Sequence, residues 1–129
     1  MSMITENTIV VRTEDIDAFM AALKKQKEEH GGIENSRKVF KNDEVAIFVF
    51  DCNGQPFVIE KDVNWLVLET NFLDGDEYYT QWFNEETGCY EDTDTTADEL
   101  IKQMLDEKSY AIVKEKIRYT VEKDKQYWM

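Results

Sequence analysis

Apolar residues recur along the first third of the chain in a pattern that predicts a strand followed by a helix. Residues 8–12 form a β-branched run, which is typical of a strand. Thr13 then stands where a helix N-cap is expected, and the glycine pair at 31–32 stands where that helix should end. Between them the apolar residues keep the i, i+3, i+4, i+7 spacing of one helix face: Ile16, Phe19, Met20 and Leu23.

The middle of the chain carries short apolar runs separated by turn residues, as antiparallel sheets do. Turns are expected at 42–43, at the Asn-Gly pair 53–54, and at 86–88. The run at 45–51 is apolar on both faces, which favours a strand in the centre of the sheet. The runs between these turns predict strands at 37–40, 45–51, 57–60, 65–68, 78–83 and 89–90.

Further helices are expected after residue 95. Thr96 and Glu99 have the spacing of a capping box, and an apolar face follows it between residues 100 and 105. Residues 110–121 fit a helix or a strand, and we predict a helix. The predicted fold class is α+β, an antiparallel β-meander of about five to six strands with an N-terminal helix and one or two C-terminal helices packed on one face.

The composition narrows the class of protein. A length of 129 residues predicts a single domain over 1–129, and 42% hydrophobic residues exclude a disordered acidic tail. No apolar run approaches the ~20 residues that span a bilayer. Residues 1–6 lack the basic and apolar regions of a signal peptide, and two cysteines fit a reducing compartment. We therefore expect a cytoplasmic protein.

The charge is concentrated in one segment. The net charge is −13, and residues 60–99 alone hold 13 acids and 1 base, for a net −12. Residues 62–101 contain no lysine, arginine or histidine. Nucleic acids and anionic membranes are themselves negative, so neither is expected to bind directly. We expect these carboxylates to gather on one exterior surface, whose natural complement is a basic protein.

Groups suited to catalysis are scarce. His30 is the only histidine, and it stands near the expected end of the first helix, where a solvated side chain is the ordinary outcome. Catalytic arrangements of the Ser-His-Asp and Cys-His types would both need this histidine as their base. Neither Cys52 nor Cys89 has basic neighbours in the sequence, so both are interpreted as structural thiols. The sequence predicts no enzyme and no cofactor.

Metal binding is not predicted either, although one alternative stays open. The chain lacks the histidines and cysteines of a zinc site, and its two Asp-x-Asp pairs, at 74–76 and 92–94, depart from the EF-hand pattern. Clustered carboxylates can also hold Mg²⁺. A small metal-dependent hydrolase is therefore an alternative, and its residues would be Asp74, Asp76, Asp92 and Asp94.

Aromatic residues interrupt the acidic segment, which suits a protein interface because they bury area while the charges steer approach. Strand alternation also allows half of them to face the core, with the acids only solvating the outside. The candidate partner-binding residues are Glu77, Tyr79, Trp82, Glu85, Glu86, Tyr90, Glu91, Asp92 and Asp94.

In size, charge and lack of catalytic groups the chain is similar to small acidic inhibitors. These include the DNA-mimic, anti-restriction and anti-CRISPR proteins of phages, and immunity proteins against nucleases. The resemblance implies an inhibitor that occupies the basic nucleic-acid-binding surface of a partner enzyme. The alternative to the inhibitor and to the metal-dependent hydrolase is a structural or assembly protein, for example a homodimer, whose acidic surface only keeps it in solution.

Overall fold

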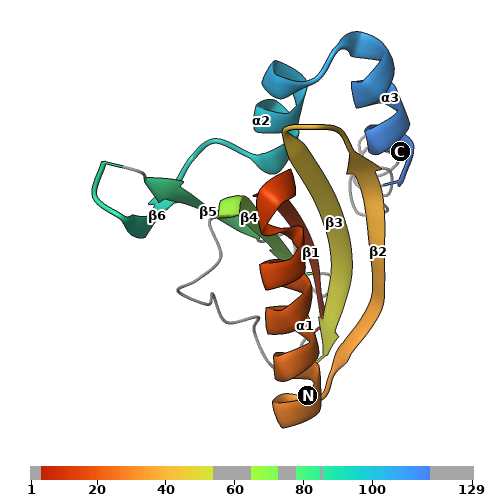
Figure 1. Ribbon diagram of the computed structural model, residues 1–129, viewed down its shortest axis with the longest axis vertical. Coiled ribbons are helices and arrows are strands. Elements are labelled where there is room, and N and C mark those ends of the chain that lie inside the picture. Colours follow the sequence, from red (N-terminus) through yellow and green to blue (C-terminus); the bar gives the residue numbers. More distant parts are fainter. Residues whose placement is uncertain (1–3, 54–64, 73–77, 85, 117–129) are drawn as a thin grey trace.

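The chain folds, in the computed structural model, into one antiparallel sheet with helices on both faces (Figure 1). The structure describes residues 4–53, 65–72, 78–84 and 86–116, with backbone only for 78, 79, 83, 84, 89 and 90. The strands are β1 (Ile4–Arg12), β2 (Ile33–Lys41), β3 (Val45–Asn53), β4 (Trp65–Phe72), β5 (Tyr78–Asn84) and β6 (Cys89–Thr93). The helices are η1 (Thr13–Asp15), α1 (Ile16–His30), α2 (Ala97–Met104) and α3 (Glu107–Lys116).

Strand β1 lies in the middle of the sheet, whose order is β2-β3-β1-β4-β5-β6. It pairs with β3 on one side and β4 on the other, and Ile9, Val10 and Val11 are fully buried. In the predicted meander the strands that follow β3 along the chain would have continued the sheet from it, without β1 between β3 and β4. The inserted first strand is the difference from the expected connectivity, and it follows from apolar side chains on both faces of β1, which need cover on both sides.

Helix α1 covers one face of the sheet. Its Phe19 is fully buried, with ring centroids 4.9 Å from Phe48 and 5.9 Å from Trp65, the latter edge to face. Ile9 and Val11 of β1 belong to the same apolar cluster. The periodicity of the sequence therefore identified Phe19 and Leu23 of the buried face correctly. Met20, which it placed on the same face, is 43% exposed, and the helix buries Ala22 and Gln26 in addition.

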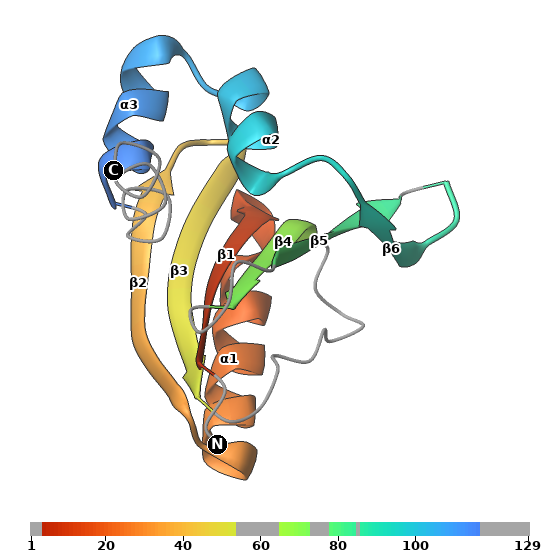
Figure 2. The same ribbon diagram turned by 180° about the vertical axis from the view of Figure 1, so that it is seen from behind.

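Helices α2 and α3 cover the opposite face, as Figure 2 shows from behind. Ile101 and Val113 pack there with Val10, Ile47 and Val67. These observations confirm the α+β class and the packing of two C-terminal helices on one face. Among the described helices, none is long and apolar enough to cross a membrane.

The start of α2 confirms the predicted threonine cap. The Oγ1 of Thr96 accepts a hydrogen bond from the Glu99 amide at 3.1 Å. A carboxylate from the sheet adds to this cap, because Oε1 of Glu69 accepts from the Ala97 amide at 3.1 Å. The acceptor at this helix N-terminus therefore ties α2 to strand β4.

The predicted cap of α1 is wrong. Thr13 opens the short turn η1, and its hydroxyl donates instead to the Asn42 carbonyl at 2.7 Å. Asp15 occupies the N-cap position without a side-chain capping bond. The β2–β3 turn explains the change, because Oδ1 of Asn42 accepts from the Glu44 and Val45 amides and holds the Asn42 carbonyl beside Thr13.

The other segment predictions hold within the described residues. The strands are longer than expected, and residues 110–116 are helical. The predicted strand at 57–60, Gly54 of the 53–54 turn and residues 117–121 lie outside the described residues.

The helix α1 ends at the glycine pair, and Gly32 is required there. Its φ is +76°, and a Cβ would stand 2.5 Å from the Asn53 carbonyl oxygen.

Replacing Phe19 by alanine should lower the free energy of unfolding by about 3–5 kcal/mol, because it leaves a cavity between α1 and the sheet. Met20, the next residue, is 43% exposed, so Met20→Ala should cost about 1 kcal/mol or less. Urea denaturation of the two variants measures both values. Equal losses would contradict the assignment of the buried face of α1.

Candidate partner-binding site

Strands β5 and β6 form a hairpin that extends from the sheet away from the helices (Figures 1 and 2). Its attachment is the ladder between β4 and β5, which runs from Val67 opposite Trp82 to Asn71 opposite Tyr78. Among the described residues, neither apolar cluster of the core includes a member of β5 or β6. The hairpin is therefore a part of the sheet whose outer portion no helix buries.

Among the described side chains of this hairpin, Trp82 is a large apolar one that is exposed. It is 40% exposed, although its partner in the next strand, Val67, is buried under α2 and α3. Directly opposite Trp82 on the other strand is Glu91. Paired residues of an antiparallel ladder point to the same face, so an exposed indole and an exposed carboxylate lie side by side.

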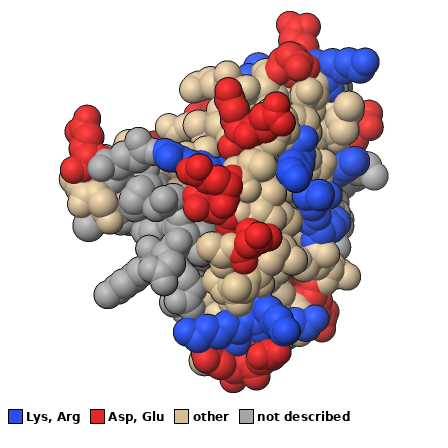
Figure 3. Space-filling view, in the orientation of Figure 1, with Lys and Arg blue, Asp and Glu red and all other residues tan. Residues whose placement is uncertain are grey.

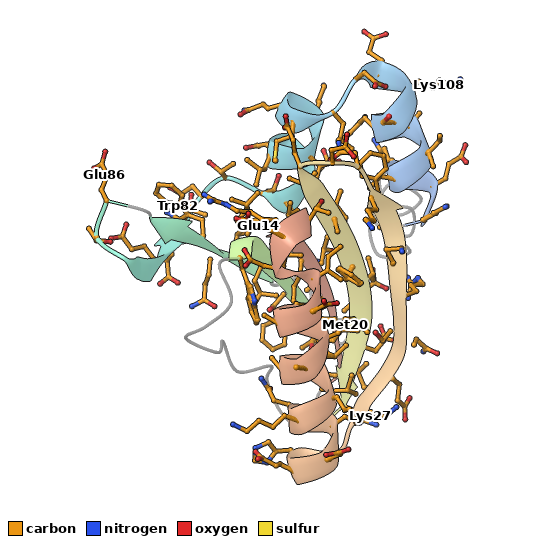
Figure 4. The ribbon with its side chains drawn as sticks, viewed as in Figure 1. Glu14, Met20, Lys27, Trp82, Glu86 and Lys108 are labelled. Carbon is orange, nitrogen blue, oxygen red and sulfur yellow. The ribbon has the colours of Figure 1, made fainter. Side chains whose placement is uncertain are left out.

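The described acids of the hairpin line both of its faces rather than one. Glu91 shares its face with Trp82, whereas the next residue, Asp92, is paired with Gln81 and points to the opposite face. Glu86 lies in the turn at the tip of the hairpin, as Figure 4 shows, and Asp94 follows β6. All four carboxylates are exposed. The prediction of a single acidic surface is therefore wrong for the described acids of the hairpin, which place charge on both of its faces.

The structure locates only part of the predicted set. It brings together Trp82, Glu86, Glu91 and Asp92 on the hairpin. Glu77 and Glu85 lie outside the described residues, as do the side chains of Tyr79 and Tyr90. The partner-binding roles of all nine predicted residues stay predictions.

Other acids of the base-free segment have structural roles. Glu69 is 8% exposed, and its two oxygens accept from the Ala97 amide and from Nδ2 of Asn71. Asp98 accepts a hydrogen bond from the Tyr110 hydroxyl, which links α2 to α3. These two carboxylates stabilise the fold and are not available to a partner.

The sequence analysis missed a set of buried polar residues on strands β1, β3 and β4. Glu6 is fully buried, and its neighbour across the ladder is Asp51, which accepts from Nδ2 of Asn35 at 2.9 Å. On the other face, the Thr70 hydroxyl donates to Oδ1 of Asn7 at 2.9 Å. The available signal was a run of polar residues, 5–8, directly before the apolar part of a central strand.

The described residues contain no group of three or more His, Cys, Asp or Glu side chains placed to hold a metal ion. Asp92 and Asp94 are exposed, and Asp74 and Asp76 lie outside the described residues, so the hydrolase alternative is untested. His30 is half exposed at the end of α1, with Nε2 3.9 Å from a Glu29 oxygen. This agrees with the solvated position expected for it.

Cys52 is buried on the α1 face of β3. Burial, and to a smaller extent the nearby Asp51 carboxylate, raise the pKa of this thiol to about 11, although hydrogen bonds to Thr5 and Asn7 lower it in part. A thiol with a raised pKa stays protonated and is a poor nucleophile. Cys52 is therefore structural, as the sequence indicated.

Basic and acidic side chains are concentrated on opposite edge strands of the sheet. The edge strand β2 carries three basic residues, Arg37, Lys38 and Lys41, and one acid, Glu34, whereas the opposite edge strand β6 carries Glu91 and Asp92. Figure 3 shows basic side chains along β2 and at the end of α1, and the acidic tip of the hairpin at the other side of the molecule. Elsewhere on this view acids are interspersed, so the contrast lies between the two edges of the sheet.

Quenching of tryptophan fluorescence tests the environment of Trp82. In a Trp128→Phe background the emission comes from Trp82 and from the fully buried Trp65. Cationic caesium should quench the exposed indole more than anionic iodide does, after each is normalised to free N-acetyltryptophanamide, because the carboxylates attract cations. The charge reversal Glu91→Lys should shrink this difference. Equal quenching by both ions would show that the acids do not surround the indole.

Alkylation by iodoacetamide tests the burial of Cys52. At pH 8 a pKa of about 11 leaves about one thiol in a thousand ionised, so native Cys52 should react about a hundredfold more slowly than in urea. A Cys89→Ser background isolates this thiol. A native rate equal to the rate in urea would contradict the buried position.

Comparison of the chain with protein-family models, with curated proteins and with solved structures gives no match. A function therefore has to be argued from the geometry of the hairpin itself.

Proposed function

We propose that this protein binds and inhibits a nucleic-acid-binding protein by inserting the acidic β5–β6 hairpin into the basic surface of that partner. The observation that carries the proposal is the exposed Trp82 beside Glu91 on a hairpin that extends from the fold. Trp is among the side chains that most often dominate binding energy at interfaces. The proposed setting is the cytoplasm, and the proposed partner is an enzyme that acts on nucleic acid, as for anti-restriction or anti-CRISPR inhibitors and nuclease immunity proteins.

Carboxylates on both faces suit entry into a cleft. A protein that holds a nucleic acid contacts phosphates from more than one side, so its basic residues line opposite walls. Glu91 and Asp92 point to opposite faces of the hairpin and would each meet one wall. Glu86 at the tip would lead the approach.

The charges and the indole would have different effects on binding. Exposed acids increase the association rate with a basic partner, and this increase falls steeply as salt is added. The indole would slow dissociation, because its buried area and water exclusion hold the complex together. The proposal therefore gives separate roles to residues that lie next to each other.

Reversing the exposed acids of the hairpin tests the proposal. The variant Glu86→Lys, Glu91→Lys, Asp92→Lys, Asp94→Lys should no longer capture the partner from a host lysate, because it repels a basic surface. The captured protein should also be released from the wild-type chain by a short DNA duplex, which competes for the same surface. Circular dichroism would verify that the fold is retained.

A matched control has the same change in net charge at other exposed positions: Glu28→Lys, Glu29→Lys, Asp43→Lys and Glu115→Lys. It should capture the partner nearly as well as the wild type does. Loss of capture in both variants would mean that only net charge matters. Capture that survives the hairpin variant, or that DNA does not displace, would refute the proposal.

A further inference from the structure

A second surface, at the opposite edge of the sheet, has the features of a ligand site. A groove of about 490 Å³ lies between α1 and the edge strand β2. Its apolar lining comes from Met20 and Leu23 of the helix and Ile33 of the strand. Leu23 and Ile33 are buried, whereas Met20 is 43% exposed. The groove therefore presents an apolar floor with one accessible, adaptable side chain.

Two lysines stand along the helical side of this groove. Lys24 and Lys27 both line it and are both exposed. Residues three apart on a helix are neighbours, about 5–6 Å between their Cβ atoms, so the two ammonium groups follow one another along the groove. Figure 4 shows Met20 and Lys27 on the side of α1 that faces the strands, and Figure 3 shows the basic side chains at this end of the molecule.

We propose that this groove binds an acidic peptide segment of a partner protein, with a large apolar side chain against Met20 and carboxylates at Lys24 and Lys27. The two lysines give the helical side of this groove a local positive charge, although the protein as a whole has a net charge of −13. Two cations in a row match successive carboxylates of a peptide better than one anionic head group. Glu34, on the strand side, is the acid among the lining residues and sets the polarity of the site across the groove.

The overall negative charge does not prevent this binding. At physiological ionic strength the Debye length is about 8 Å, so the acids of the distant hairpin are largely screened from a ligand in the groove. The lysines act at contact distance, where screening is weaker. The site is independent of the proposed role of the β5–β6 hairpin, and either proposal can fail without the other.

Fluorescence anisotropy with a defined probe tests the groove. The probe is a short fluorescein-labelled peptide in which leucine alternates with glutamate, measured at physiological ionic strength. The wild-type chain should bind it saturably. The double variant Lys24→Glu, Lys27→Glu should bind about tenfold more weakly, because two attractions become repulsions. A peptide with alanine in place of leucine should also bind more weakly, because the apolar floor loses its contact.

The matched control is Lys102→Glu, Lys108→Glu, which makes the same change in net charge at exposed lysines of α2 and α3. It should bind the probe as the wild type does. Equal weakening in both double variants would overturn the proposal, as would tighter binding of a leucine–lysine peptide. Absence of probe binding, with self-association that Lys24→Glu, Lys27→Glu abolishes, would assign the groove to a second copy and also overturn it.

Discussion

The pairing of β1 with both β3 and β4 is the constraint on which the rest of the structure depends. It places the apolar residues Ile9, Val10 and Val11 in the centre of the sheet, where side chains on both faces need cover. Helix α1 supplies that cover on one face, and α2 and α3 supply it on the other. The core is therefore built on the strands β3, β1 and β4, with Ile33 and Val39 of β2, whereas β5 and β6 extend beyond it.

This arrangement explains where the acids can stand. A buried strand must be apolar or must satisfy each polar group, as Glu69 does by accepting from the Ala97 and Asn71 nitrogens. Strands β5 and β6 extend beyond the helices and have no such requirement for Glu91, Asp92 or Trp82. The sheet ladder holds them in place while their side chains remain exposed. A concentration of like charge is tolerated there because water and salt screen it.

Local patterns in the sequence predicted most of the elements but not their arrangement. Part of the buried face of α1, the Thr96 cap and the Asn42 turn depend on residues a few positions apart, so the sequence alone identified them. The insertion of β1 between β3 and β4 depends on pairing between residues far apart in the chain, as Ile9 with Phe48 and with Leu68, and no local pattern records it. The Thr13 cap failed for the same reason, since its hydroxyl bonds to Asn42. For the candidate site, composition found the acidic segment, whereas the register was needed to separate Glu91 from Asp92.

The two edges of the sheet have opposite character, and this has a consequence for how partners approach. The β2 edge carries Arg37, Lys38 and Lys41, and the β6 edge carries Glu91 and Asp92. Charges separated in this way give the molecule an electric dipole. The field of an approaching charged partner orients this dipole before the two molecules touch. A basic partner would therefore meet the hairpin first, and an acidic one would meet the edge formed by α1 and β2. Because the folded core fixes the distance between the two edges, a ligand at one edge leaves the other accessible. On the two proposals, the same fold would hold partners of opposite charge at its two edges, which a chain with its acids spread evenly could not distinguish.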